Sequence, residues 1–420
     1  MFGLPRTLWI VQVGIFLNTL GWAAILPFEL IYLHNERGFG LGFSGLVVGA
    51  ITGLAVVGAP AAGAAIDRFS ARATAVASGL ALAAGYAGLA FAQTHPQALA
   101  AAAVAGIGNG GLNPSQSVLL TVLVPPHFRH RATAVSRVAG NLGFALGSAL
   151  GGAVAAHGLN GFVILLLANA ATYVVYVVIL AISARGESPQ AQTSGGYRQV
   201  LRDRVFIRLA LTTVAVICVG WGVFSWIVPT FARNQLGLST TLIGLFAFTN
   251  ALTVVVAQIP VARIAEGRRR TVTMASGAVV FAAACLLATG ADLASSRVAV
   301  PALLAAFALV GLGECLYTTV LTPLAADLAP PTLRGRYMAV IGVSWWLGLA
   351  VAPIAGTQLL AVSPLVTLLT AAAIATAAAG SALALGHNLP PDTRRTPRPA
   401  LSRRAEPRTA SRSSAGTHPT

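Results

Sequence analysis

Long apolar runs separated by short polar segments fill the chain from its start to about residue 386. One helical crossing of a bilayer needs about 20 consecutive apolar residues, and the sequence has twelve runs of that order. The runs are rich in Gly and Ala, which let helices approach closely in lipid. The sequence therefore predicts an all-α membrane protein with twelve transmembrane helices, at 7–33, 43–66, 74–93, 98–124, 132–156, 160–183, 208–231, 240–264, 271–290, 297–325, 337–360 and 364–386.

An internal repeat predicts how these helices are grouped. Residues 106–152 align without a gap with residues 311–357, and the Pro-Pro pair at 125 falls on the pair at 330. An offset of about half the chain indicates two homologous six-helix bundles, and parallel repeats of this kind suit alternating access to a site between them. We expect an N-terminal bundle at 1–183, a cytoplasmic linker at 184–207, a C-terminal bundle at 208–388 and a disordered basic tail at 389–420.

The net charge of +16 would be typical of a nucleic-acid-binding protein, but its distribution favours a membrane protein. Only 9% of residues are charged, and the 27 basic residues are all Arg. Sixteen lie in segments on one side of the predicted membrane, seven in the tail, three on the other side and one inside the fifth helix. The positive-inside rule then places both termini in the cytoplasm. We expect the tail to lie near anionic lipid head groups, not on nucleic acid, because it has no stacking aromatics.

Two motifs give the chain a resemblance to a known family. The loop after the second predicted helix is similar to the major facilitator signature G-x-x-x-D-R-x-G-R-R, and the fifth predicted helix is similar to that family's antiporter signature G-x-x-x-G-P-x-x-G-G. Ser70 and Ala71 depart from the first signature, and Ser148 replaces the Pro of the second. The residues that match are Gly63, Asp67, Arg68 and Arg72 in the loop, and Gly143, Gly147 and Gly151 in the helix.

The resemblance implies that these residues form a conformational gate. It suggests that Asp67 braces the outward-facing state against the second bundle near the eleventh helix. The alternative is a local ion pair of Asp67 with Arg68 or Arg72, which would contribute little. The glycine row has a simpler interpretation as well, because glycines at four-residue spacing allow tight packing against a neighbouring helix.

Ionisable side chains inside the predicted helices are candidates for proton coupling or substrate binding, because each is costly in hydrocarbon. Glu314 lies near the middle of the tenth helix, where desolvation disfavours a charged carboxyl group, so it suits a proton carrier or a neutral packing residue. Glu29 lies near the outer end of the first helix. It is a second candidate for proton binding, and the alternative is a position shallow enough for its carboxyl group to be hydrated. Arg137 either reaches the cytoplasm by snorkelling or faces the cavity as partner of an anion.

Polar and aromatic side chains within the helices predict the substrate site. Amides face the bundle interior or a wet cavity in lipid, although some only join helices. Tryptophans several turns from the helix ends are unlike an interfacial belt, and a flat aromatic surface suits an apolar or cationic substrate. The candidates are Asn18, Asn109, Asn113, Asn141, Asn250, Trp22, Trp221, Tyr317, Trp345 and Trp346.

The first functional hypothesis is a proton-coupled exporter of small organic or drug-like compounds. The second is uptake of a metabolite or organic anion with Arg137 as its partner, and the third is a membrane-embedded enzyme or scaffold. The sequence has no Walker loop, H-E-x-x-H motif or paired cysteines, so we expect no cofactor, no metal and no enzymatic activity. The arginine-only, alanine-rich composition is typical of a GC-rich bacterial genome. We expect the protein to lie in a bacterial inner membrane and to be a monomer.

Overall fold

The computed structural model describes residues 6–124, 129–183, 197–292, 296–330 and 332–396, and every long element among them is a helix. The first crossing combines α1 (Arg6–Ile25), the 3-10 turn η1 (Leu26–Phe28), α2 (Glu29–Ile31) and the π-helical η2 (Tyr32–Glu36). The N-terminal bundle is completed by α3 (Leu41–Arg68), α4 (Ala71–Phe91), α5 (His95–Leu123), α6 (Arg129–Ala155) and α7 (Leu159–Ser183).

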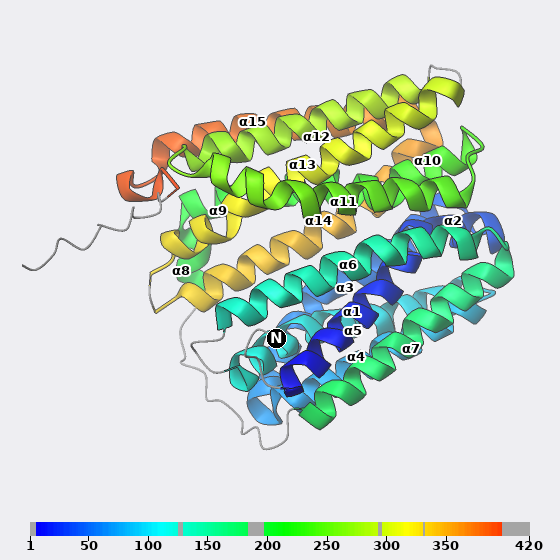
Figure 1. Cartoon of the computed structure of the whole chain (residues 1–420), viewed down its shortest axis with the longest axis horizontal. Coiled ribbons are helices and arrows are strands. Elements are labelled where there is room, and N and C mark those ends of the chain that lie inside the picture. Colours follow the sequence, from blue (N-terminus) through cyan, green and yellow to red (C-terminus); the bar gives the residue numbers. More distant parts are fainter. Residues whose placement is uncertain (1–5, 125–128, 184–196, 293–295, 331, 397–420) are drawn as a thin grey trace, which may run out of the picture.

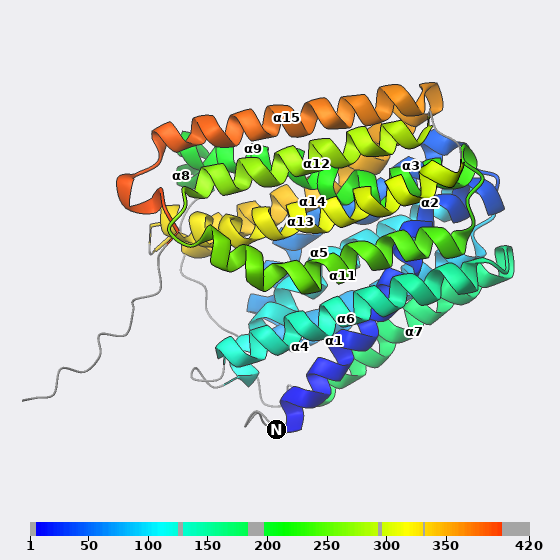
Figure 2. The same ribbon diagram turned by 45° about the horizontal axis from the view of Figure 1, so that its top comes forward.

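The C-terminal bundle repeats this arrangement. Its first crossing combines α9 (Arg204–Ile217), the π-helical η4 (Cys218–Ile227) and α10 (Val228–Asn234). It is followed by α11 (Thr240–Ala265), α12 (Arg270–Asp292), α13 (Ser296–Leu328), α14 (Arg334–Val362) and α15 (Pro364–Asn388). The two bundles occupy the lower and upper halves of Figure 1, and α6 and α11 run side by side between them in both views (Figures 1 and 2).

The expectation of twelve membrane helices is confirmed. Among the described residues, 11 helices are long and apolar enough to cross a membrane. The remaining long helix, α5, spans 29 residues and has the amides Asn109, Asn113 and Gln116 among its apolar residues. A transmembrane helix with amides on one face needs a polar surface to place them against, so its composition already indicates a cavity inside the bundle.

The two bundles meet at one end of the molecule, which we call the closed end; it lies away from the start of α1 and the end of α15 (right in Figure 1). There α3 packs on α14 and α6 packs on α11. A Cβ atom on Gly152 would lie 2.6 Å from the Thr240 carbonyl oxygen, and the Thr240 hydroxyl donates to the Gly152 carbonyl at 3.1 Å. Gly45 of α3 similarly abuts Thr357 of α14. The small residues therefore bring helices of different bundles into backbone contact.

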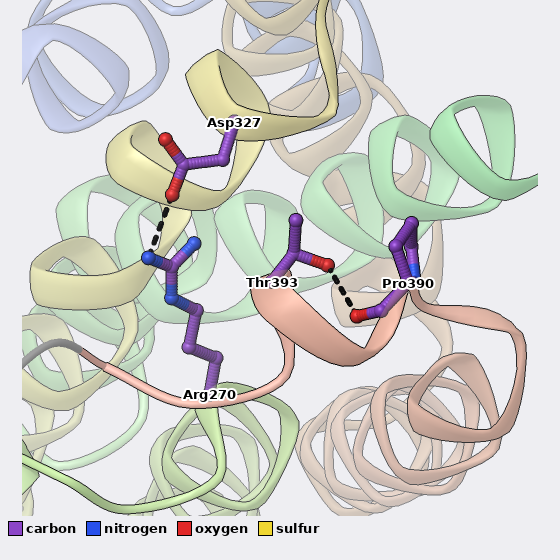
Figure 3. A network of polar contacts seen from close by, with 4 residues as sticks. All are labelled: Arg270, Asp327, Pro390 and Thr393. Atoms are coloured by element: carbon purple, nitrogen blue, oxygen red, sulfur yellow. Dashed lines mark hydrogen bonds and ion pairs between the residues drawn. The ribbon is translucent and has the colours of Figure 1, made fainter.

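The other end carries the start of α1 and the end of α15, and we call it the terminal end (left in Figure 1). Here the Arg270 guanidinium, buried at 3% exposure, pairs with the Asp327 carboxylate at 2.7 Å (Figure 3). Gly267 and Arg268 exchange backbone hydrogen bonds with Thr396, and the Thr393 hydroxyl donates to the Pro390 carbonyl at 2.9 Å.

These contacts change two boundaries expected from the sequence. The segment expected to be disordered from 389 onward is structured as far as Thr396 and contains η5 (Pro391–Thr393), because its backbone pairs with the loop before α12. Residues 397–420 lie outside the described residues. The linker contributes α8 (Tyr197–Arg202), and α9 begins within the expected linker, at Arg204, where the Asp203 side chain accepts from the backbone N–H groups of Val205 and Phe206.

The glycine row of α6 generates a stability prediction. A Cβ atom on Gly147 would collide with the backbone of Leu20 in α1, whereas one on Gly380 of α15 would meet nothing within 4 Å. Gly147→Val should therefore lower the free energy of unfolding by about 3 kcal/mol, and the same change at Gly380 should cost less. Thermal unfolding of both variants in one detergent, followed by size-exclusion chromatography, measures the difference. Equal losses would contradict this account of the packing.

The Arg270–Asp327 pair predicts an asymmetry between its two partners. Asp327→Asn leaves a buried guanidinium without its counter-charge, whereas Arg270→Gln leaves a carboxylate that is 47% exposed and hydrated. Removing one partner is costly when the remaining charge is buried, so Asp327→Asn should destabilise the protein by about 2 kcal/mol more than Arg270→Gln. Thermal unfolding of the two variants and their double mutant provides the test. The opposite ranking would show that the pair does not hold α12 to α13.

Candidate functional site

A cavity of about 320 Å³ lies between the two bundles. It is lined by Trp22, Asn141 and Phe144 of the N-terminal bundle and by side chains of η4, α11, α13 and α14 of the C-terminal bundle. Glu314 is the one Asp, Glu, Lys, Arg or His among its described lining residues, and we call the space the Glu314 cavity. The wall is otherwise mainly aromatic and aliphatic, as in sites that bind small organic molecules.

A second cavity of about 460 Å³ shares Thr19, Trp22, Trp345 and Leu349 with the first and extends toward the terminal end. Its additional lining includes two tyrosines, Tyr173 and Tyr176, and four amides, after which we call it the amide cavity: Asn18, Asn109, Asn113 and Gln116. Asn113 and Gly342 of this lining are exposed. The two cavities therefore form one path that is sealed at the closed end and accessible from the terminal end.

Glu314 is held at the cavity wall by close packing of α13 on α11. A Cβ atom on Gly311 would lie 2.7 Å from the Asn250 carbonyl oxygen, so the glycine lets the two helices approach. The Asn250 side-chain amide donates to Glu314 Oε1 at 3.4 Å, which is a long hydrogen bond. Glu314 itself lines the cavity, and its Oε2 accepts no hydrogen bond from the described residues, so this oxygen can meet a ligand.

Aromatic rings form the rest of the wall in pairs. Trp22 meets Phe144 edge-on with ring centroids 5.8 Å apart, and Trp221 lies against Trp345 at 4.6 Å. The first pair joins two helices of the N-terminal bundle, and the second joins η4 to α14. Their π faces attract cations electrostatically, so the cavity combines one carboxyl group with surfaces suited to an organic cation.

Glu29 is buried at 4% exposure and is not among the lining residues of either cavity. The Tyr86 hydroxyl donates to its Oε1 at 3.1 Å, and the Trp226 indole donates to its Oε2 at 3.0 Å. Glu29 and Tyr86 belong to the N-terminal bundle and Trp226 to η4 of the other bundle. Hence the carboxyl group joins the two bundles on the closed-end side of the Glu314 cavity and is not hydrated at the surface.

The structure brings most of the predicted substrate residues together. Asn18, Trp22, Asn109, Asn113, Asn141, Trp221, Asn250, Trp345 and Trp346 all line one of the two cavities. Tyr317 does not; it is fully buried, with its hydroxyl 2.9 Å from that of Thr213. Arg137 is exposed on α6 and lies outside both linings, so its role as an anion partner stays a prediction.

The predicted gate residues fall into two groups. Gly143, Gly147 and Gly151 pack α6 against the α1 backbone, in agreement with the simpler interpretation of the row. Gly63, Asp67, Arg68 and Arg72 lie at the terminal end of α3 and the start of α4. Asp67 is half-buried and makes no ion pair with the described residues. This absence is expected where the bundles are apart, and the bracing role stays a prediction.

Sequence reasoning did not predict Tyr86, which donates a hydrogen bond to Glu29. It also did not predict three residues that line the Glu314 cavity: Phe144, Ser225 and Phe307. A polar group within an apolar helix is a usable signal for Tyr86, whose ring stacks on Tyr173 at 5.9 Å. Phe144 and Phe307 carry no such signal, since a phenylalanine in lipid is unremarkable until its helix is oriented. The described residues contain no group of three His, Cys, Asp or Glu side chains that could hold a metal ion.

Comparisons with known proteins point to one family. The sequence profile described as "Major Facilitator Superfamily" matches residues 12–233 and 210–416. The chain is 27% identical to the uncharacterized MFS-type transporter YttB of Bacillus subtilis over 84% of this chain and 88% of that one. It is 26% identical to the multidrug resistance protein MdtH of Aeromonas salmonicida over 81% and 84%. A crystal structure of a peptide transporter POT in complex with sulfate has the same fold, with a TM-score of 0.77 at 15% identity over 92% and 96%.

The Glu29–Trp226 contact predicts how the closed end is held. Trp226→Phe keeps the ring but removes one of two donors to a buried carboxyl group, a loss of about 1.5–3 kcal/mol. If the contact holds the bundles together, a cysteine at the buried position Thr357 should become labelled by maleimide about tenfold faster. The measurement uses a background without Cys218, Cys285 and Cys315, and Trp9→Phe near the terminal end is the matched control. An unchanged labelling rate would show that other contacts suffice.

Proposed function

This chain belongs to the Major Facilitator Superfamily and is a secondary transporter, and from that premise we propose that it exports apolar or cationic organic compounds in exchange for protons. The observation that carries the proposal is Glu314, a carboxyl group in an aromatic cavity between the bundles that forms no ion pair with the described residues. The names of the MdtH relatives, which are multidrug resistance proteins, also support it.

The Glu314 cavity gives a physical reason for exchange. A carboxylate in a water-poor aromatic cavity needs a proton or a cation beside it, and the long bond from Asn250 supplies only part of that stabilisation. A bound organic cation and a proton therefore compete for the same group. Binding of one favours release of the other, and this mutual exclusion couples their movement in opposite directions.

The proposed orientation identifies which step of the transport cycle the structure represents. The positive-inside pattern assigns the terminal end to the cytoplasm, so the structure corresponds to a state open to the inside and closed to the outside. In this state the aromatic cavity receives substrate from the cytoplasm or the inner leaflet. Opening the other side requires breaking the cross-bundle bond between Trp226 and Glu29.

Glu29 is the second proposed proton site, with a role at the outer seal. An ionised Glu29 accepts from both Tyr86 and Trp226, whereas a protonated carboxyl group keeps fewer acceptor positions for them. Proton arrival from outside would thus weaken the seal. After the bundles rock, Asp67 approaches the C-terminal bundle and braces the inner end, as the family resemblance implies.

Glu314→Gln tests the proposal directly, because it keeps the side-chain size and removes the exchangeable proton. We expect export of a fluorescent organic cation in a drug-hypersensitive bacterial host to fall to the level of cells without the protein. Glu266→Gln, at an exposed loop position, is the matched control and should export like the wild type. Expression in the membrane is equalised by immunoblot, and an uncoupler must abolish the wild-type export.

Purified protein in liposomes separates this proposal from uptake. Substrate added on the side of the terminal end should drive protons in the opposite direction, recorded with a trapped pH dye. Proton movement together with the substrate would indicate symport and overturn the exchange mechanism. In that case Arg137→Ala would be the variant to examine, since an anionic substrate needs a cationic partner that the Glu314 cavity does not supply.

A further inference from the structure

A third cavity, of about 390 Å³, lies at the terminal end of the C-terminal bundle. It is formed where α12 begins and α15 ends, and these two helices run side by side in both views (Figures 1 and 2). Its lining includes Arg269, His387 and Arg394. It shares no lining residue with the Glu314 cavity or the amide cavity, so transport chemistry gives no account of it.

The charge around this third cavity is strongly positive. Arg269 and Arg394 line it, and Arg268 and Arg395 are exposed beside them. The Arg269 side chain makes no hydrogen bond or ion pair with the residues that the structure describes. The nearby acids are Glu266 and Asp392, both exposed, and Asp327, which is paired with Arg270 (Figure 3). Arg269 and Arg394 thus both line one space, and neither pairs with a carboxylate among the described residues.

Hydrogen bonds and close helix packing place Arg394 near Arg269. The Arg270 N–H donates to the Arg394 carbonyl at 2.9 Å, and Arg394 Nε donates to the Leu389 carbonyl at 2.8 Å. A Cβ atom on Gly386 would lie 2.7 Å from Thr271 Oγ1, so the glycine allows α15 to approach α12. The guanidinium of Arg394 is therefore carried to the start of α12, beside Arg269, by an ordered segment.

The apolar part of the lining identifies the kind of ligand. Val272 is 44% exposed and Leu383 is 48% exposed, and both line the cavity. On α12 the exposed stripe continues through Val279 and Leu286, each 54% exposed and seven residues apart, along the face that meets lipid. The cavity therefore opens from a cationic headgroup region onto an apolar helix surface.

We propose that this third cavity binds one anionic phospholipid. Its phosphate would contact Arg269, whose guanidinium suits bidentate recognition of phosphate oxygens. Arg394 would add one donor, Nη1, because its Nε and Nη2 already donate to the Leu389 and His387 carbonyls. Thr271 and His387 would supply further donors. One acyl chain would lie along Val272, Val279 and Leu286. Basic pockets between transmembrane helices are known to take anionic head groups. The lipid would join the ordered segment after α15 to the start of α12 and so stabilise the terminal end of the bundle.

Native mass spectrometry of the purified, delipidated full chain tests the proposal. Titration with dioleoyl phosphatidylglycerol should give one bound lipid, at an apparent affinity about tenfold or more above that for dioleoyl phosphatidylcholine. Arg269→Gln should weaken the phosphatidylglycerol complex about fivefold, and Arg269→Gln with Arg394→Gln about 25-fold. The matched control, Arg198→Gln with Arg202→Gln, removes two exposed arginines of α8 and should bind like the wild type.

Three results would overturn the proposal: equal affinity for the two lipids, unchanged binding in the double variant, or equal weakening in the control. Millimolar inorganic phosphate distinguishes the other source of this chemistry. If inorganic phosphate binds as tightly as the lipid, the acyl chains add nothing to the affinity, so the cavity is a site for a free anion and the lipid assignment is wrong. If the double variant does not elute as a single species, Arg269→Gln alone decides, because its side chain makes no contact that folding requires.

Discussion

Backbone contact between small residues holds the two bundles together at the closed end. In lipid, burial of apolar side chains does not drive helices together, so the two bundles need surfaces that fit closely. Gly152 against Gly244 and Gly45 against Thr357 provide such surfaces. Larger side chains, including Trp221 and Trp345, stand between the bundles further along, and there the helices remain apart. The cavities exist because the close contact ends part-way along the bundle interface.

Two carboxyl groups between the bundles differ in what surrounds them. Glu29 has a donor at each oxygen, one from each bundle, so its bonds are complete and its effect is to hold the bundles together. Glu314 accepts one long bond from the side chains that the structure describes, and it also lines the cavity. A group with unfilled hydrogen-bonding capacity in an apolar space is the one that exchanges partners. Because their hydrogen bonding differs, the two carboxyl groups have different roles in the proposed transport cycle.

The arginines of the terminal end have more than one physical consequence. The positive-inside rule explains how many arginines lie on this side of the membrane, but it does not depend on the exact position of each one. Their positions nevertheless matter, because backbone pairing of residues 394–396 with 267–270 brings Arg394 beside Arg269. Arg270, in the same run, is instead buried against Asp327. Adjacent arginines therefore differ in environment, as surface, cavity or buried ion pair.

The helices, their grouping into two bundles and the residue types of the site can all be predicted from the sequence. Hydrocarbon solvates neither charges nor free peptide groups, so apolar runs must be helices, and each intramembrane polar residue is a candidate for the cavity. Which of these candidates meet depends on how the helices pack against one another. Rotation of each helix about its axis sends Asn109 to the amide cavity and Glu314 to its own, and it sends Tyr317 into the core and Arg137 outward. That rotation is fixed by contacts between distant helices, such as Gly311 with Asn250, which no local pattern encodes.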